Sequence, residues 1–250
     1  MRLGIDFGTT RIVVAAVDRG NYPVVSFETP DGSASEWFPP WVAASGGERR
    51  YGWNAWAWQE KPEWTFVRSI KRSLAGAGPQ TAVVVGEQQL PMARLLAELM
   101  SELRQALLYR SSLNPKEGEP LEVVLGTPAN ANTNQRFLTA AAFREAGFEV
   151  LGLLNEPSAA SIEFGHRYQP LRDRRRLLVY DFGGGTFDAS LVEMQESEHV
   201  VVASEGVPAL GGDDFDLLLA ELAFEAQGLG PAEWDSLTQS ETFRLVEECR

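Results

Sequence analysis

The chain has few of the residues that common catalytic and metal sites require. Its single cysteine, Cys249, cannot form an intrachain disulfide, which fits a reducing compartment. Its two histidines, His166 and His199, have no partner at a metal-ligand spacing, and we interpret both as structural or solvent-facing. No Gly-x-Ser-x-Gly segment is present. These absences exclude the usual zinc sites and the α/β-hydrolase triad.

Lysine and long apolar runs are equally scarce. Lysine occurs only as Lys61, Lys71 and Lys116, and none of them follows a glycine, which excludes a P-loop. The longest apolar runs, such as residues 12–17, have the length of a strand and not of a membrane span. No charged and then apolar leader precedes a small-residue cleavage site, so we expect a cytoplasmic protein without a signal peptide.

The composition is that of an acidic globular protein. The 250 residues are 44% hydrophobic and 23% charged, enough for one large domain or for two lobes. The formal net charge is −13 at pH 7. Because such a surface repels phosphate backbones and anionic lipids, we predict binding to neither nucleic acid nor membrane.

Strand and helix signals alternate along the chain, which predicts α/β layering. The expected strands cover residues 3–6, 12–17, 121–125, 148–154, 177–181, 187–192 and 200–204. The expected helices cover residues 91–110, 134–146, 158–164 and 213–226. Residues 167–176 contain a proline and five arginines and are the expected linker.

One motif occurs twice. A strand ending in Asp-Phe, a glycine turn with threonine and a returning strand are found around residues 6–10 (DFGTT) and again around residues 181–186 (DFGGGT). The repetition suggests a duplicated architecture in which two similar lobes face a cleft. Plain hairpins are the alternative for a single copy, but shared Asp-Phe-Gly and threonine residues argue against it for both.

These turns have the chemistry of a polyphosphate site. Glycines expose consecutive backbone N–H groups that can bind phosphate oxygens, and threonine adds a hydroxyl donor. Asp6 and Asp181, at the strand ends, are candidates to hold Mg²⁺ through water. The candidate phosphate-binding residues are Gly8, Thr9, Thr10, Gly183, Gly184 and Gly185.

Four segments together resemble the signature series of the heat shock protein 70 family. They are residues 6–10, 155–160 (NEPSAA), 181–188 (DFGGGTFD) and 210–216 (LGGDDFD), in the family's order and approximate spacing. The resemblance extends over nearly the whole chain and is weakest in residues 21–85 and after residue 227. It implies an α/β, two-lobed, actin-like ATPase fold (duplicated and ribonuclease-H-like), with ATP or ADP and Mg²⁺ as ligands.

The resemblance also assigns catalytic roles. Lys71 is similar to the family's catalytic lysine, which positions the attacking water and the γ-phosphate, although a solvated surface charge is its alternative. Glu156 and Asp188 are similar to the polar pair that orders the water network. Thr186 would lie close to the γ-phosphate, and Asp181 completes the expected catalytic set. Phosphoryl transfer requires mainly positioning and charge neutralisation, which such a set can supply.

Other roles concern signalling. Pro128 and Arg136 resemble residues that transmit the nucleotide state to a substrate-binding domain, but they also fit a strand stop and an exposed helix residue. Gly211 and Gly212 resemble a loop that meets nucleotide at a helix N-terminus, with a plain tight turn as the alternative. By resemblance alone, the expected partners are unfolded client proteins, J-proteins and nucleotide exchange factors of the stress response.

The chain departs from the family in three places. Arg11 replaces a small polar residue, and residues 129–131 lack the usual aromatics, which concerns interdomain signalling more than ATP binding. Residues 53–64 contain four tryptophans, of which Trp53 and Trp56 are three positions apart. We interpret this spacing as packing in a small subdomain and not as a ligand cage.

The expected domains are lobe I at residues 1–170, with a smaller inserted subdomain at about 37–112, and lobe II at residues 171–250. Thr238 and Glu241 form a capping box, but no residue that ends a helix follows. We therefore interpret the chain as an N-terminal portion with an incomplete second lobe, and expect weak or absent nucleotide affinity for these 250 residues.

Three other functions remain open. A sugar or small-molecule kinase shares the superfold, but the Asn-Glu-Pro-Ser-Ala-Ala run is of the chaperone type. An actin-like filament protein is disfavoured by the four motifs. A non-catalytic scaffold that keeps the fold is disfavoured by the intact set of candidate site residues.

Overall fold

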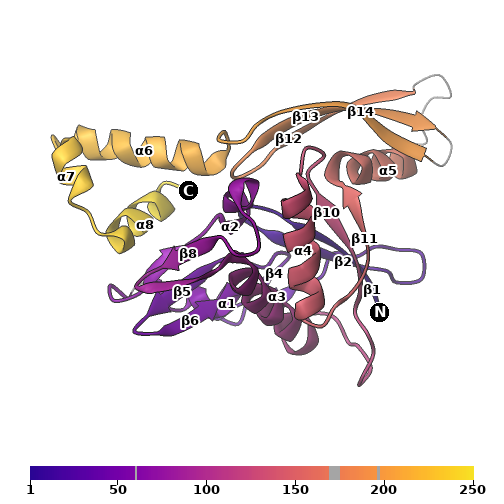
Figure 1. Ribbon diagram of the computed structural model, residues 1–250, viewed down its shortest axis with the longest axis horizontal. Helices are drawn as coiled ribbons and strands as arrows, with labels where there is room; N and C mark the ends of the chain where they lie inside the picture. The colour runs from indigo at the N-terminus through magenta and orange to yellow at the C-terminus, as the bar shows by residue number, and fades with distance from the viewer. Residues whose placement is uncertain (60, 169–174, 196–197) are drawn as a thin grey trace.

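The computed structural model describes residues 1–59, 61–168, 175–195 and 198–250 (Figure 1). A four-stranded sheet with the order β11-β10-β1-β2 carries the first motif. Its strands are β1 (Arg2–Phe7), β2 (Ile12–Ala16), β10 (Glu122–Thr127) and β11 (Glu149–Asn155). β1 pairs antiparallel with β2 and parallel with β10, which pairs parallel with β11. Alternate residues of β1 are buried, as expected of a strand that packs one face on a core.

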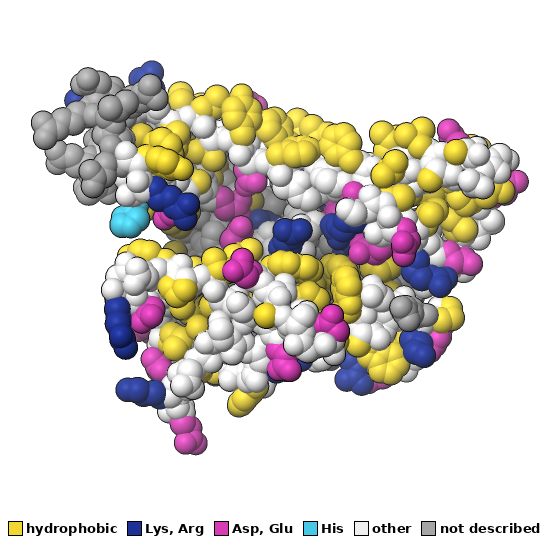
Figure 2. All heavy atoms as spheres, turned by 180° about the vertical axis from the view of Figure 1, so that it is seen from behind, with side chains coloured by type: hydrophobic (Ala, Val, Ile, Leu, Met, Phe, Trp, Pro, Cys, Tyr) yellow, Lys and Arg dark blue, Asp and Glu magenta, His cyan; other side chains and the backbone are white. Residues whose placement is uncertain are grey.

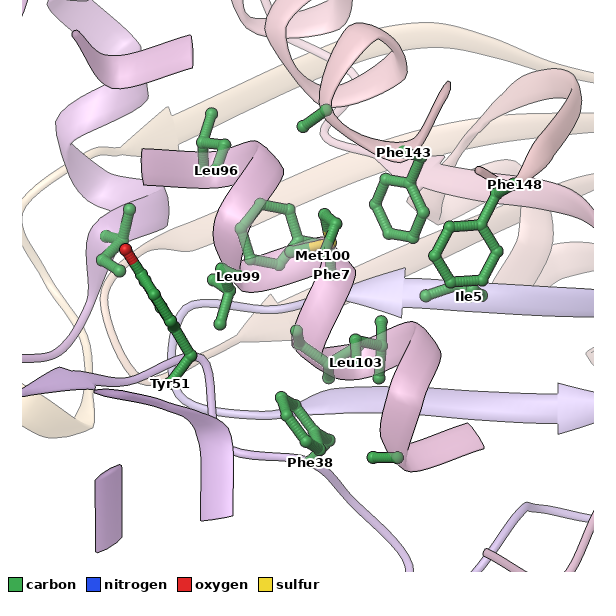
Figure 3. Close-up of a cluster of buried hydrophobic side chains, with 14 of the residues drawn as sticks. Ile5, Phe7, Phe38, Tyr51, Leu96, Leu99, Met100, Leu103, Phe143 and Phe148 are labelled. Carbon is green, nitrogen blue, oxygen red and sulfur yellow. The ribbon is translucent and has the colours of Figure 1, made fainter. Parts of the chain in front are cut away.

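Two helices supply the core that covers this sheet. α3 (Met92–Tyr109) presents its predicted leucine stripe, and it packs beside α4 (Thr133–Glu145). Figure 3 shows Leu96, Leu99, Met100 and Leu103 of α3 meeting side chains of β1 and Phe143 of α4. The predicted helix at 134–146 therefore exists, and an Asn132–Gln135 capping box starts it one residue earlier.

The second motif lies in a separate antiparallel sheet of β12 (Arg176–Phe182), β13 (Phe187–Gln195) and β14 (Glu198–Val207). α5 (Glu156–Tyr168) contacts strands of both sheets and so lies between them. This helix is longer than the predicted 158–164, since it includes both Glu156 and four residues after Phe164. Within the predicted linker, residues 169–174 lie outside the described residues, while Arg176 already belongs to β12.

Small strands and helices fill the segment between β2 and α3. β5 (Val42–Ser45), β6 (Glu48–Tyr51) and β7 (Thr65–Val67) form a sheet with the order β6-β5-β7. The remaining elements are β3 (Phe27–Glu28), β4 (Ala34–Ser35), α1 (Gly52–Trp56), α2 (Ile70–Ser73), η1 (Leu74–Gly76), β8 (Ala82–Val85) and β9 (Gln88–Pro91). The tryptophans pack on one another: Trp41 stacks on Trp56 at 4.7 Å, and Trp58 lies 4.8 Å from Trp64 between ring centroids. The interpretation as packing is confirmed.

Three helices follow β14 and return to the Trp-rich segment. They are α6 (Gly212–Ala226), α7 (Pro231–Asp235) and α8 (Gln239–Glu248). α8 begins at the predicted Thr238–Glu241 capping box. Its Phe243 stacks on Phe66 of β7 at 4.9 Å, so the C-terminal helix lies against the β5–β7 sheet (Figure 1). Across the described ranges, no helix combines the length and hydrophobicity that crossing a bilayer requires.

Candidate functional site

The two Asp-Phe motifs form turns of the same construction. In the turn between β1 and β2, the Gly8 N–H donates to the Arg11 carbonyl at 3.0 Å. In the turn between β12 and β13, the Gly183 N–H donates to the Thr186 carbonyl, also at 3.0 Å. The predicted repeat is therefore a repeat of structure as well as of sequence.

These turns also meet each other. A Cβ atom placed on Gly184 would lie 2.1 Å from Thr10 Cγ2, and one on Gly185 would lie 2.7 Å from Thr9 Cγ2. Both distances are shorter than atoms can approach, so glycine at each position is what lets the threonines of the first turn fit against the second. The structure thus brings four of the six candidate phosphate-binding residues into contact, Thr9, Thr10, Gly184 and Gly185, while Gly8 and Gly183 each begin one of the two turns.

The start of α6 docks onto the second turn. The Gly212 N–H donates to the Gly183 carbonyl at 3.0 Å, and the Asp213 N–H donates to the Gly184 carbonyl at 2.7 Å. Gly211 approaches so closely that a Cβ on it would lie 2.5 Å from the Gly184 carbonyl carbon. The predicted loop at Gly211 and Gly212 therefore lies directly against the second turn, and two N–H groups at the helix start donate to that turn.

Lys71 and Glu156 form an ion pair beside the turns. Lys71 Nζ lies 2.8 Å from Glu156 Oε1, and the two side chains are 17% and 18% exposed. Lys71 belongs to α2 and Glu156 is the first residue of α5, so the pair joins segments 85 positions apart. Gly126 of β10 lies beside the glutamate, since a Cβ there would be 3.4 Å from Glu156 Cγ, about van der Waals contact.

The carboxylates around Lys71 have raised pKa values. Burial raises the pKa of Asp6, and the Asp181 charge raises it further, while Lys71 opposes both effects. Burial likewise raises the pKa of Glu156 against the opposing charge of Lys71. The pKa of Asp188 is raised by burial and then by Asp181. Several acids thus share one lysine, and the excess negative charge suits a cation.

A cleft of about 270 Å³ opens next to Lys71. It collects five predicted site residues from both motif-bearing regions: Thr9, Lys71, Pro128, Thr186 and Asp188. Figure 2 shows a furrow between the two parts of the molecule, with acidic and basic side chains gathered along it.

Eight of the residues that line the cleft were not predicted, and three of them bear on its polar groups. Arg72 and Gln135 line the cleft, and Gly206 makes space for the Asp188 carboxylate, which a Cβ would approach to 2.3 Å. Arg72 directly follows Lys71, and this adjacency was the one available sequence signal.

Arg136 braces the loop that carries Pro128. Its guanidinium donates to Thr127 Oγ1 at 3.0 Å, to the Pro128 carbonyl at 3.2 Å and to Asn155 Oδ1 at 2.9 Å. The arginine therefore ties the ends of β10 and β11 together. Arg11, the departure in the first turn, lies over the Trp37 ring at 5.4 Å from its centroid.

The donor set fits a Mg²⁺–nucleotide. Asp6, Asp181, Glu156 and Asp188 bring carboxylate oxygens to the site, which suit a Mg²⁺ ion held through water. Burial is the main cause of the raised pKa values of Asp6, Glu156 and Asp188. Within the described ranges, no three His, Cys, Asp or Glu side chains are grouped closely enough to hold a metal ion directly.

The fold and site together define a mixed α/β protein in which two glycine hairpin turns meet beside a lysine–glutamate pair. Comparison with known proteins shows which family this α/β protein resembles. The family model described as Hsp70 protein matches residues 78–230. The chaperone protein HscA of Proteus mirabilis is 33% identical over 262 residues, covering 99% of this chain and 41% of that protein.

Two further relatives are also chaperone proteins. The chaperone protein DnaK of Metamycoplasma hominis is 34% identical over 215 residues, which cover 86% of this chain and 34% of the relative. The HscA homolog of Methylibium petroleiphilum is 36% identical over 247 residues, which cover 91% and 38%. The chain therefore spans about two-fifths of the length of the curated relatives it matches.

The chain belongs to the Hsp70 family. Membership implies the actin-like ATPase fold, and the mixed α/β organisation agrees with it. Hsp70-family chaperones bind ATP and ADP and are ATPases in general. The predicted family is confirmed.

Proposed function

We propose that these residues form an ATP-binding and ATP-hydrolysing unit of an Hsp70-type chaperone, in which nucleotide drives a conformational switch for protein folding. The observation that carries the proposal is the Lys71–Glu156 pair at the place where the two glycine turns meet. Phosphoryl transfer depends on positioning and charge neutralisation, and this arrangement offers both.

In this proposal each turn has a stated task. Asp6 and Asp181 hold Mg²⁺ through water, and Mg²⁺ neutralises phosphate charge when it is bound. The backbone donors of Thr9, Thr10, Gly184 and Gly185 bind the phosphates, and Thr186 lies on the γ-phosphate side of the cleft. Gly8, Gly183, Gly211 and Gly212, whose N–H groups are bonded within the site, shape the backbone around the phosphates. Lys71 orients the attacking water and the γ-phosphate, while Glu156 holds the lysine and, with Asp188, orders the water network. The residues assigned to the phosphates are Gly8, Thr9, Thr10, Gly183, Gly184, Gly185, Gly211 and Gly212.

We further propose a two-lobed organisation. Residues 1–170 would form lobe I, with a subdomain at about 37–112, and residues 171–250 would begin lobe II. The second lobe is incomplete within these 250 residues. Exposed apolar side chains support this assignment, since Tyr180 is 67% exposed, Phe182 56% and Leu222 53%. Large apolar side chains gathered on a surface often mark a contact with another part of a protein.

The remaining assignments extend the same proposal. Pro128 and the bracing Arg136 would pass the nucleotide state from the cleft to a client-binding region. Unfolded clients, J-proteins and nucleotide exchange factors would be the partners, and the cytoplasm the compartment. Since the second lobe is incomplete here, nucleotide affinity of the 250 residues alone would be weak.

Hydrolysis and binding by the complete gene product test the proposal. Wild type should hydrolyse ATP in the presence of Mg²⁺, and Lys71→Ala should reduce hydrolysis about 100-fold or more while ADP affinity, measured by calorimetry, changes far less. Lys61→Ala is the matched control, because Lys61 is an exposed lysine in the same region of the chain. Absence of both nucleotide binding and hydrolysis in wild type would make the chain a scaffold, and glucose-dependent ADP release would make it a kinase.

A further inference from the structure

The segment that carries Lys71 has an unusual backbone. Ser69, the residue before α2, adopts the left-handed conformation with φ 60° and ψ 30°. A non-glycine residue takes this conformation only where its surroundings hold it there. In this case the side chain is held, because the Ser69 hydroxyl donates a hydrogen bond to Asp213 Oδ2.

Asp213 is bound on its other side to the second glycine turn. Its backbone N–H donates to the Gly184 carbonyl at 2.7 Å. Its second carboxylate oxygen accepts from Arg250 Nη2 at 2.8 Å, and the side chain is only 10% exposed. One residue at the start of α6 therefore contacts both the loop that carries Lys71 and the turn assigned to phosphate.

The loop needs such an anchor. α2 has four residues, too few to be stable by its own hydrogen bonds. Glu156 holds Lys71 directly from the α5 side. A parallel contact runs from Arg72 Nη2 to Asp214 Oδ1 at 3.1 Å, so α6 holds this loop through two consecutive acidic residues.

We propose that Asp213 is a positioning residue: through Ser69 it sets the place of the Lys71 ammonium relative to the turn at residues 183–186. The assignment rests on the proposed function, which gives Lys71 its task in hydrolysis. A movement of α6 would then move Lys71 with it, although Lys71 itself is paired with Glu156 of α5.

The first test reads Lys71 without using activity. Lysine labelled with ¹³C at the ε-carbon gives three NMR signals, because the chain has three lysines, and Lys71→Arg assigns the relevant one. Asp213→Ala and Ser69→Ala should each shift the Lys71 signal, and the double variant should shift it no further than the larger single effect. The signals of Lys61 and Lys116 should stay in place.

Asp216→Ala is the matched control. Asp216 lies on the same helix and also faces Arg250, at 3.6 Å, but it has no bond to Ser69. Replacing Asp216 with alanine should leave the chemical shift of the Lys71 ε-carbon unchanged. An unmoved signal in Asp213→Ala, additive shifts in the double variant, or an equal shift in Asp216→Ala would overturn the proposal.

The second test uses hydrolysis by the complete gene product. Asp213→Ala should slow single-turnover hydrolysis about tenfold while ATP affinity stays within about threefold, as expected when only the geometry of the reacting groups changes. Asp213→Asn retains an acceptor oxygen and should recover most of the rate. An unchanged rate, or equal losses of rate and affinity, would contradict positioning. If wild type fails to hydrolyse ATP, the proposed function fails, and the NMR experiment still decides whether Asp213 places Lys71.

Discussion

The two hairpins that carry the Asp-Phe turns differ in what lies around them. In the β1–β2 hairpin, Ile5, Phe7 and Val14 are 2%, 2% and 0% exposed. On β12 of the second hairpin, Leu178 and Tyr180 are 52% and 67% exposed. The same turn is thus carried once by a strand embedded in a core and once by a strand with solvent on its apolar side chains.

This difference in burial indicates that the two turns are held in place by different parts of the molecule. The first turn is fixed by the packing of β1 between β2 and β10 and by α3 and α4 (Figure 3). The second turn is instead held by α6, through the bonds to the Gly183 and Gly184 carbonyls. Moving a strand that is packed in the core would disrupt many side-chain contacts at once. Moving the second turn would require breaking only two hydrogen bonds to the start of α6, and these can form again. We therefore regard the first turn as the fixed half of the site and the second as the adjustable half.

Truncating one strand residue in each hairpin tests this contrast most strongly. Ile5→Ala should lower the free energy of unfolding by about 3 kcal/mol, since it leaves a cavity in a close-packed core. Leu178→Ala should lower it by about 0.5 kcal/mol or less, because more than half of the side chain already faces solvent. Urea denaturation followed by tryptophan fluorescence measures both. Equal losses would show that the second hairpin is as firmly packed as the first.

The second prediction concerns the contact between the turns. Gly184→Val should push Thr10 away and weaken ADP binding by the complete gene product about 10- to 100-fold, the range expected from an overpacked contact of about 1–3 kcal/mol. Gly4→Ala is the control, because Gly4 has no role in the site and no heavy atom would lie within 4 Å of the new Cβ. Calorimetric titration with ADP gives the affinities.

A compensating change sharpens this result. Thr10→Ala removes the Cγ2 and Oγ1 atoms that the valine meets, so combining it with Gly184→Val should recover part of the lost affinity. If the double variant binds as poorly as the single one, the glycine matters for its own backbone and not for the space it leaves to Thr10.

Much of this comparison could be predicted from the sequence because it is local. The turn chemistry, the strands on either side and the leucine stripe of α3 each depend on residues close together in the chain. The end of α5 was predicted too early, because Gly165, a residue type that often ends helices, lies inside this one. Short strands around the tryptophans had no period long enough to detect.

The parts that could not be predicted are contacts across the chain. Ser69 and Asp213 are 144 positions apart, and nothing in either residue type announces a partner. The fit of Thr10 against Gly184 is likewise visible only when both hairpins are in place. The motifs predicted which residues come together. The distances between those residues depend on how α5 and α6 position the second sheet relative to the first.

The third prediction is a pH dependence of hydrolysis. The Lys71–Glu156 pair requires a charged glutamate, and burial raises the pKa of Glu156 above its ordinary value. Hydrolysis should therefore fall several-fold as the pH is lowered through that raised pKa, at a higher pH than for an ordinary glutamate. Glu156→Gln should be slower than wild type at pH 7 and should lack this acidic limb. A limb that persists in the variant would assign it to Asp6 or Asp188.

The smallest expected effect is on stability, at Asp6 near the end of β1. Because the pKa of Asp6 is raised above its ordinary 3.8, the folded state binds a proton more readily than the unfolded state. The free energy of unfolding therefore decreases as the pH rises from 3.8 through the raised pKa, and at pH 7 the charged carboxylate opposes folding. Asp6→Asn removes this charge and should raise Tm by about 1–3 °C at pH 7.

The pH profile separates this cause from any other. Wild type should gain stability relative to Asp6→Asn as the pH falls toward the raised pKa, so that the difference in Tm disappears in acid. Asp235→Asn, on an exposed position of α7, should change Tm by less than about 1 °C at every pH. If Asp6→Asn instead lowers Tm, the carboxylate stabilises the fixed half of the site. The first hairpin would then owe part of its rigidity to the charge at its tip as well as to its core.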